Sequence, residues 1–323
     1  MRIRALSLGK LTAIIAVVVT VGWWLTPPKL VNAATIPKLP ENLETWIAAS
    51  EQAVNGEYQL IPGTEKRVRW QTTGNKTEYS IVYLHGFSAT RQEIAPTTEI
   101  VADRLNANLY ETRLSGHGHR RLPMDGVRAE QWLQDGVEAI RIGAALGDKV
   151  VVIGTSTGAT LALALSGHPV MDDVAALILI SPNMAPADPT AAWLTRPAGP
   201  LMARLVVGNT RSWTPHNELQ ARYWSTSYPI DATVEVMRLV DRAQRLTSTT
   251  MSQDVLMLLS PEDKVISPQA ARDAFDVIDA PRKNLVQVRA EDPSNHVLAG
   301  DILSPGTTHE IAEQIVSFIT SKN

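Results

Sequence analysis

Residues 150–165 read VVVIGTSTGATLALAL, and this stretch decides how the rest of the chain is interpreted. Its first four residues are all β-branched, which predicts a strand buried on both faces of a sheet. The Ala- and Leu-rich residues 159–165 predict a helix that packs against this strand. The pattern Gly154-x-Ser156-x-Gly158 lies between the two elements, so we expect a sharp turn from strand into helix there.

This Gly-x-Ser-x-Gly turn has the pattern of a nucleophile elbow, in which a strained turn raises a serine hydroxyl above the edge of the sheet. Side chains at Gly154 and Gly158 are expected to collide with the neighbouring backbone, which gives both glycines a steric reason. The helix that follows directs its N-terminal amides to the same point, where they favour a developing negative charge. Ser156 is therefore the candidate nucleophile.

Composition places the chain among ordinary globular proteins. With 323 residues, 44% hydrophobic and 20% charged, it can bury a large core, and no linker or repeat divides it. The sequence has no cysteine, so disulfides and thiolate metal sites are excluded. Its formal charge of -3 disfavours binding to nucleic acid.

The N-terminal residues 1–33 have the composition of a secretory signal. A basic head is followed by the apolar run 11–25, two prolines and a small-residue site that predicts cleavage after Ala33. Cleavage would remove four basic residues and no acid, taking the formal charge from -3 to -7. We expect export to a periplasm or the exterior. The alternative is an uncleaved membrane anchor formed by residues 11–25.

The remaining chain alternates predicted strands with predicted helices, which favours a mainly parallel sheet covered on both faces. The strands are expected at 68–72, 79–84, 108–111, 150–153, 175–180, 255–259 and 285–288. The helices are expected at 94–105, 129–146, 159–165, 233–246 and 307–319. Residues 34–67 are interpreted as an N-terminal extension with helical periodicity, and 68–323 as the main domain.

Residues 184–230 interrupt this alternation. They contain six prolines, three tryptophans and the apolar patch 201–207. We interpret them as a helical cap over the ends of the strands. An irregular insertion whose tryptophans only fill a core remains the alternative.

A serine hydroxyl needs a base, and the base needs a third group to orient it. In the elbow architecture the acid and the histidine follow the serine, in loops after late strands. His296 comes after the strand expected at 285–288, whereas His309 falls at the start of the last helix, so His296 is favoured. Asp263 follows the strand expected at 255–259 and is the favoured acid, with Glu262 as its alternative.

Two backbone amides are needed to stabilise the oxyanion of a tetrahedral intermediate. One is that of Thr157, which follows the nucleophile, and the other is expected at Phe87, after the strand that ends at Leu84. His85 precedes the nucleophile and is interpreted as a structural brace of this loop.

His117 and His119 are two residues apart, which raises the possibility of a metal site. No carboxylate at a useful spacing accompanies them, so the metal interpretation is disfavoured.

Taken together, these motifs resemble the α/β-hydrolase superfamily, in particular its carboxylesterase and monoacylglycerol-lipase-like branch. The matching pieces are His85-Gly86-Phe87, residues 113–118, the elbow 154–158, residues 261–266 and Asn295-His296-Val297. The resemblance implies an eight-stranded, mostly parallel sheet with a cap after the sixth strand. It also implies the triad Ser156, Asp263 and His296, and supports Phe87 and Thr157 as oxyanion donors.

The sequence therefore predicts a serine hydrolase that cleaves a carboxylic ester, with an apolar acyl or aromatic substrate and no metal or organic cofactor. An acyltransferase and a C–C or amide hydrolase on the same triad remain alternatives. A non-catalytic binding protein on this scaffold is the alternative of another class.

Overall fold

The computed structural model describes residues 9, 34–196 and 198–321. The predicted signal peptide 1–33, and with it the alternative anchor at 11–25, lies outside the described residues apart from Gly9. Within the described part, no helix is both long enough and apolar enough to cross a membrane.

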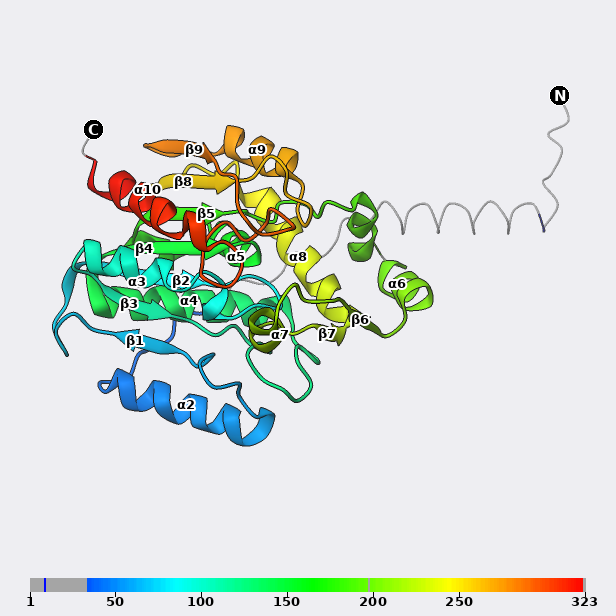
Figure 1. Cartoon of the computed structure of the whole chain (residues 1–323), viewed down its shortest axis with the longest axis horizontal. Helices are drawn as coiled ribbons and strands as arrows, with labels where there is room; N and C mark the ends of the chain where they lie inside the picture. The colour runs from blue at the N-terminus through cyan, green and yellow to red at the C-terminus, as the bar shows by residue number, and fades with distance from the viewer. Residues whose placement is uncertain (1–8, 10–33, 197, 322–323) are drawn as a thin grey trace, which may run out of the picture.

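A seven-stranded sheet forms the centre of the described residues, in the order β1-β3-β2-β4-β5-β8-β9 (Figure 1). All neighbouring strands are parallel except β1, which runs antiparallel to β3 at one edge. The strands are Arg67–Arg69 (β1), Thr77–Leu84 (β2), Asn108–Glu111 (β3), Gly147–Thr155 (β4), Val174–Ile180 (β5), Asp254–Leu259 (β8) and Lys283–Gln287 (β9).

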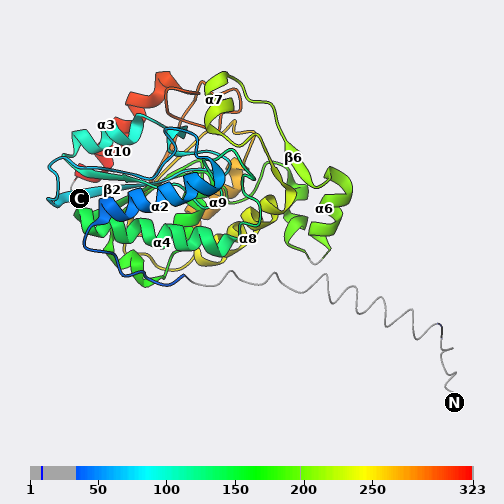
Figure 2. The ribbon, with the colours of Figure 1, turned by 90° about the horizontal axis from the view of Figure 1, so that it is seen from below.

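Helices cover both faces of this sheet, as Figures 1 and 2 show. One core cluster packs α4, α5, α8 and α9 against one face, and a second packs α3 and α10 against the other. The helices are Leu43–Tyr58 (α2), Thr97–Arg104 (α3), Ala129–Leu146 (α4), Thr157–Ala164 (α5), Ile230–Leu246 (α8), Pro268–Val277 (α9) and Thr308–Thr320 (α10). Short 3-10 turns lie at Arg91–Glu93 (η1), Pro169–Asp173 (η2), Pro189–Thr195 (η3) and Pro305–Thr307 (η4).

The α/β-hydrolase fold predicted from the sequence is confirmed, with every expected strand of the sheet present within a few residues of its expected bounds. The strand count differs from the eight that the resemblance implies, since seven strands pair in the main sheet of the described residues. The extension before β1 forms helix α2 and a turn instead of a further strand.

Residues 184–230 follow β5 and contain more than helices. They form η3, the helices Gly199–Val207 (α6) and Glu218–Tyr223 (α7), and a two-stranded antiparallel sheet of Thr210–Ser212 (β6) and Ser227–Pro229 (β7). Helix α6 lies at the periphery of the molecule in both views (Figures 1 and 2). The segment then continues directly into α8, which packs on α5 of the sheet layer.

Candidate active site

Ser156 occupies a strained turn between β4 and α5. Its backbone angles are φ 51° and ψ -115°, in the positive-φ region that residues with a Cβ rarely adopt. The Ser156 N–H donates to the Ile180 carbonyl oxygen at 2.8 Å, which ties the turn to the end of the neighbouring strand β5. This turn leaves Ser156 buried at the carboxyl edge of the parallel strands.

The two glycines of the turn are there for the steric reason that the sequence predicted. A Cβ added at Gly158 would lie 2.0 Å from the Leu84 carbonyl oxygen, and one added at Gly154 would lie 2.6 Å from the Ala159 nitrogen. Both contacts are with backbone atoms, which cannot rotate away. The close approach of α5 to the ends of β2 and β4 therefore requires glycine at both positions.

His296 and Asp263 meet across two loops that follow β9 and β8. His296 Nδ1 and Asp263 Oδ2 are 2.7 Å apart, and the Asp263 side chain is fully buried. The other carboxylate oxygen of Asp263 accepts the N–H groups of Val265 and Ile266 at 2.8 and 3.0 Å. The carboxylate is thus fixed by its own loop, and it can only accept, so Nδ1 of His296 carries the proton and Nε2 is left with a lone pair.

The backbone of His296 is held by further buried groups. Asp292 Oδ2 accepts the N–H groups of His296 and Val297 at 2.9 and 3.0 Å. On the other side, the Ser181 hydroxyl donates to the His296 carbonyl oxygen at 2.8 Å. The imidazole is therefore positioned through its main chain as well as through Asp263.

The surroundings of His296 favour its charged form. Burial alone lowers the pKa of the imidazole, but the carboxylate of Asp263, followed by those of Glu93 and Asp292, outweighs burial, so the pKa of His296 is raised. An imidazole in this environment is a stronger base than a free histidine, and it is stabilised once it has accepted a proton.

The loop 85–88 is tied down on both sides of Phe87. The Gly86 N–H donates to Glu93 Oε2 at 2.7 Å, and the Ser88 N–H donates to Nε2 of His117 at 3.1 Å. The Phe87 N–H between them has no hydrogen-bond acceptor among the described residues. Thr157 supplies a second amide at the first position of α5, where helix N–H groups have no intrahelical partner.

His85 braces this loop against the one that follows β3. Its Nε2 accepts the Leu114 N–H at 3.0 Å, so its Nδ1 carries the proton and donates to the Gly86 carbonyl oxygen at 2.9 Å. Burial lowers the pKa of His85 to about 4, which keeps the ring neutral at physiological pH.

His117 has both ring nitrogens engaged. Nε2 accepts from Ser88 and Nδ1 donates to the Ser115 carbonyl oxygen at 3.0 Å, so His117 offers no free lone pair to a metal. Burial holds the pKa of His117 well below its usual value. No group of three or more metal-ligating side chains occurs within the described ranges. His119 instead lies against the ring of Tyr58 from α2.

The two alternatives for the acid and the base lie away from this arrangement. Glu262 is exposed, and its N–H donates to the Ser260 hydroxyl. His309 is exposed in the first turn of α10. The structure therefore brings Asp263, and not Glu262, to His296.

Ser156, Thr157, Phe87 and His296 line one cavity of about 310 Å³. Its remaining wall combines aromatic side chains of the segment 184–230, namely Trp213, Trp224 and Tyr228, with charged ones such as Arg211 and Asp292. A larger cavity of about 670 Å³ lies between η3 and α6 and does not include Ser156.

Two buried polar atoms in the wall of the 310 Å³ cavity, Thr157 Oγ1 and Asn183 Oδ1, have no partner within the described residues. Groups of this kind normally bind water or a ligand.

Sequence reasoning missed two acids at this site. Asp292 lies four residues before His296. An aspartate in a loop can accept the N–H groups of the residues that follow it, as in an Asx turn, and this is the one signal that could have indicated its role. Glu93 lies just before a predicted helix and resembles an ordinary acidic residue of a first turn. Its burial against Gly86 depends on how the loop folds back, which no local pattern encodes.

The fold and this site together define a hydrolase scaffold with a buried serine at the sheet edge and a His–Asp pair beside it. Residues 81–305 match the model of the alpha/beta hydrolase family, so the chain belongs to that family. No curated protein matches the sequence. Membership of this family supports hydrolase activity.

Solved structures share the fold at low sequence identity. A structure from work on LipS and LipT, two metagenome-derived lipolytic enzymes, has a TM-score of 0.66 at 21% identity, covering 81% of this chain and 99% of its own. The monoacylglycerol lipase of Paleococcus ferrophilus has a TM-score of 0.60 at 15% identity, with 79% and 97% covered. Est1E of Butyrivibrio proteoclasticus, with ferulic acid bound, has a TM-score of 0.51 at 16% identity, with 81% and 97% covered.

Proposed function

We propose that the protein is a serine hydrolase that cleaves carboxylic esters through an acyl-enzyme on Ser156. The observation that carries this proposal is the 2.7 Å contact between His296 Nδ1 and Asp263 Oδ2 at the wall of the cavity that Ser156 also lines. A buried carboxylate that holds the proton on Nδ1 leaves Nε2 free to act as a base, which is the arrangement that activates a serine.

In the proposed reaction, His296 Nε2 removes the proton from the Ser156 hydroxyl as the oxygen attacks the ester carbonyl. The N–H groups of Phe87 and Thr157 hold the resulting oxyanion. His296 then gives its proton to the leaving alcohol, and the acyl group stays on Ser156. A water molecule, activated by the same imidazole, adds to the acyl group and releases the acid.

The wall of the cavity supports an apolar acyl or aromatic ester as the substrate class. Phe87, Trp213, Trp224 and Tyr228 contribute aromatic surface beside Ser156. Burying the apolar groups of a substrate against this aromatic surface is favourable, which supports an apolar acyl or aromatic group over a charged one.

The proposal is tested by exposing the purified full chain to a fluorophosphonate and measuring the intact mass. A serine activated by His296 attacks phosphorus and forms one stable covalent adduct. We expect one adduct on the wild type and none on Ser156→Ala. Labelling of His296→Ala should be slowed by roughly a thousandfold or more.

Ser317→Ala is the matched control, because Ser317 is an exposed serine of helix α10, away from the cavity that Ser156 lines. It should label at the wild-type rate. A wild type that keeps its folded circular-dichroism spectrum but gains no adduct would overturn the hydrolase proposal and favour a binding protein on this scaffold.

A further inference from the structure

Glu93 is a buried carboxyl group at the catalytic cavity that the proposed mechanism does not use. It ends the short turn η1, is 2% exposed, and lines the same cavity as Ser156 and His296. A glutamate is rarely buried to this extent unless its carboxyl group is paired.

The partners of this carboxyl group are a backbone amide and a phenol. Oε2 accepts the Gly86 N–H at 2.7 Å and the Tyr83 hydroxyl at 2.9 Å. The other carboxyl oxygen, Oε1, also lies close to Gly86, because a Cβ added at Gly86 would be 2.7 Å from it. The carboxyl group therefore packs directly on the backbone that precedes the Phe87 amide.

No lysine or arginine of the described residues forms an ion pair with Glu93. Arg91, on the same turn, donates to the Glu65 carbonyl oxygen and lies 3.6 Å from Glu111. The titratable groups that face Glu93 from the elements around it are Tyr83 on β2, and His296 and Asp292 on the loop after β9. His296 is thus the group whose positive charge can compensate a charge on Glu93.

We propose that Glu93 is a positioning residue for the proposed hydrolysis, with two roles at one carboxyl group. Through Oε2 it fixes the Gly86 amide and so sets the direction of the Phe87 N–H. Through its negative charge it stabilises the imidazolium form of His296 as a second acid beside Asp263. This inference rests on the proposed function for its catalytic meaning, although the coupling to His296 can be measured without turnover.

The mutual effect of Glu93 and His296 on each other's pKa supports the second role. Burial raises the pKa of Glu93 to about 7, with the Gly86 hydrogen bond and His296 opposing the rise. Glu93 in turn contributes to the raised pKa of His296. A charge on either group therefore shifts the pKa of the other, and the two should behave as a coupled pair.

The first experiment follows the imidazole of His296 by nitrogen NMR across pH in the Ser156→Ala protein, which cannot turn over. The His296 signals are identified by their loss in a His296→Gln variant. We expect a broadened titration that Glu93→Gln converts to a single step, with a midpoint lower by roughly 0.5 to 1 pH unit. Glu78→Gln is the control, since Glu78 is exposed and pairs with Lys149. It should leave the midpoint unchanged.

The second experiment separates the two roles by kinetics on an activated ester. The glutamine in Glu93→Gln keeps an oxygen that can accept the Gly86 N–H, so we expect the acidic limb of kcat/KM to move to lower pH with only a modest loss of rate. Glu93→Ala removes the acceptor as well, and kcat should fall by roughly a hundredfold with little change in KM.

The outcomes for Glu93 and for the proposed function are distinguishable. An unchanged His296 midpoint in Glu93→Gln overturns the electrostatic role, and an unchanged kcat in Glu93→Ala overturns the positioning role, whatever the substrate. A wild type that does not label or hydrolyse overturns the hydrolase proposal, while the NMR titration still decides the coupling. If Glu93→Ala does not fold, Glu93→Asp takes its place. The aspartate side chain is one carbon too short to reach Gly86, so its kcat tests the same positioning role.

Discussion

At the scale of single residues, the site depends on backbone that few side chains tolerate. Ser156 has a positive φ, and it is held there by the hydrogen bond from its N–H to Ile180 and by the close contact of Gly158 with the end of β2. Strain of this kind persists only where the surroundings fix it. The contacts of Gly158 therefore help to hold Ser156 in this backbone conformation.

Gly158→Ala should consequently destabilise the fold. The added Cβ would lie 2.0 Å from the Leu84 carbonyl oxygen. Relieving this clash should lower the free energy of unfolding by about 1–3 kcal/mol. Denaturant titration measures the change. Gly56→Ala is the matched control, because nothing lies within 4 Å of that Cβ in helix α2. It should stabilise the protein by about 0.5–1 kcal/mol. A Gly158→Ala protein as stable as the wild type would contradict the steric argument.

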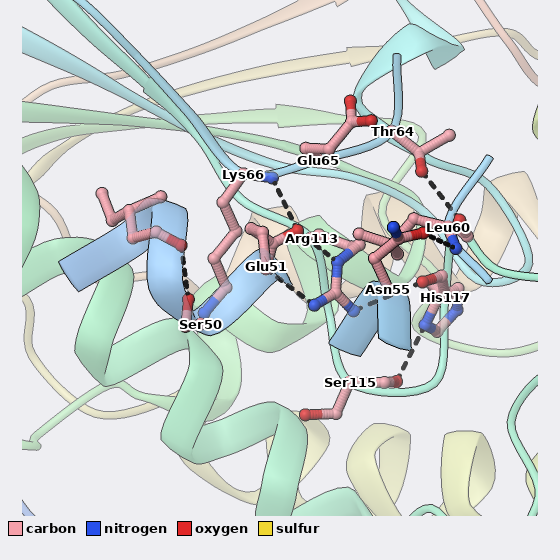
Figure 3. A network of polar contacts seen from close by, with 12 residues as sticks. Ser50, Glu51, Asn55, Leu60, Thr64, Glu65, Lys66, Arg113, Ser115 and His117 are labelled. Carbon is pink, nitrogen blue, oxygen red and sulfur yellow. Dashed lines mark hydrogen bonds and ion pairs between the residues drawn. The ribbon is translucent and has the colours of Figure 1, made fainter. Parts of the chain in front are cut away.

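At the scale of elements, helix α2 is attached to the loop after β3 by a buried ion pair. Figure 3 shows Arg113 directed at Glu51 of α2. Arg113 Nε and Nη2 donate to Glu51 Oε2 and Oε1 at 2.8 and 2.7 Å, and Oε2 also accepts the Lys66 N–H at 3.1 Å. The same loop carries His117, which holds the Ser88 N–H beside Phe87. The N-terminal extension is thus connected to the loop of the candidate oxyanion donor.

We expect Glu51→Ala to weaken this attachment strongly, because it leaves the Arg113 charge buried without its partner. The free energy of unfolding should fall by roughly 3–5 kcal/mol, and amide exchange should accelerate first in α2. Glu78→Ala breaks the exposed pair with Lys149 and provides the comparison, with an expected loss of about 0–1 kcal/mol. Equal losses for both variants would show that burial of the pair does not matter.

At the scale of the whole molecule, the cavity beside Ser156 and His296 is assembled from segments that are far apart in the chain. Ser156 follows β4, Asn183 follows β5 and His296 follows β9, while Trp213 and Trp224 come from the segment 184–230. The carboxyl ends of parallel strands meet at one edge of the sheet, which is why these residues converge. The volume of this cavity, about 310 Å³, is small for a ligand site.

This volume predicts a preference for short acyl chains. The kcat/KM for p-nitrophenyl butyrate should exceed that for the palmitate ester by roughly tenfold or more, since the longer chain does not fit within the cavity. Trp213→Ala enlarges the cavity beside Ser156 and should reduce this ratio. Trp193→Ala, in the wall of the separate cavity by α6, should leave it unchanged. A ratio that favours palmitate in the wild type would contradict the size argument.

Much of this molecule is encoded locally and could be read from the sequence. Buried strands such as 150–153 are runs of β-branched residues, and a parallel sheet follows from their alternation with amphipathic helices. The elbow around Ser156 is a local pattern as well. Asp263 and His296 could be chosen because each follows a recognisable strand, and strand order dictates that such loops meet.

The tertiary structure decided what depends on contacts between distant or irregular segments. The Glu51–Arg113 pair joins residues 62 positions apart, and the burial of Glu93 on Gly86 arises from a loop that has no repeating pattern. The pairing of β6 with β7 was also not anticipated. The periodicity of a sequence shows which face of a helix or strand is buried. A hydrogen bond or charge pair between two elements depends instead on how those elements are placed relative to each other, and only the folded chain specifies this placement.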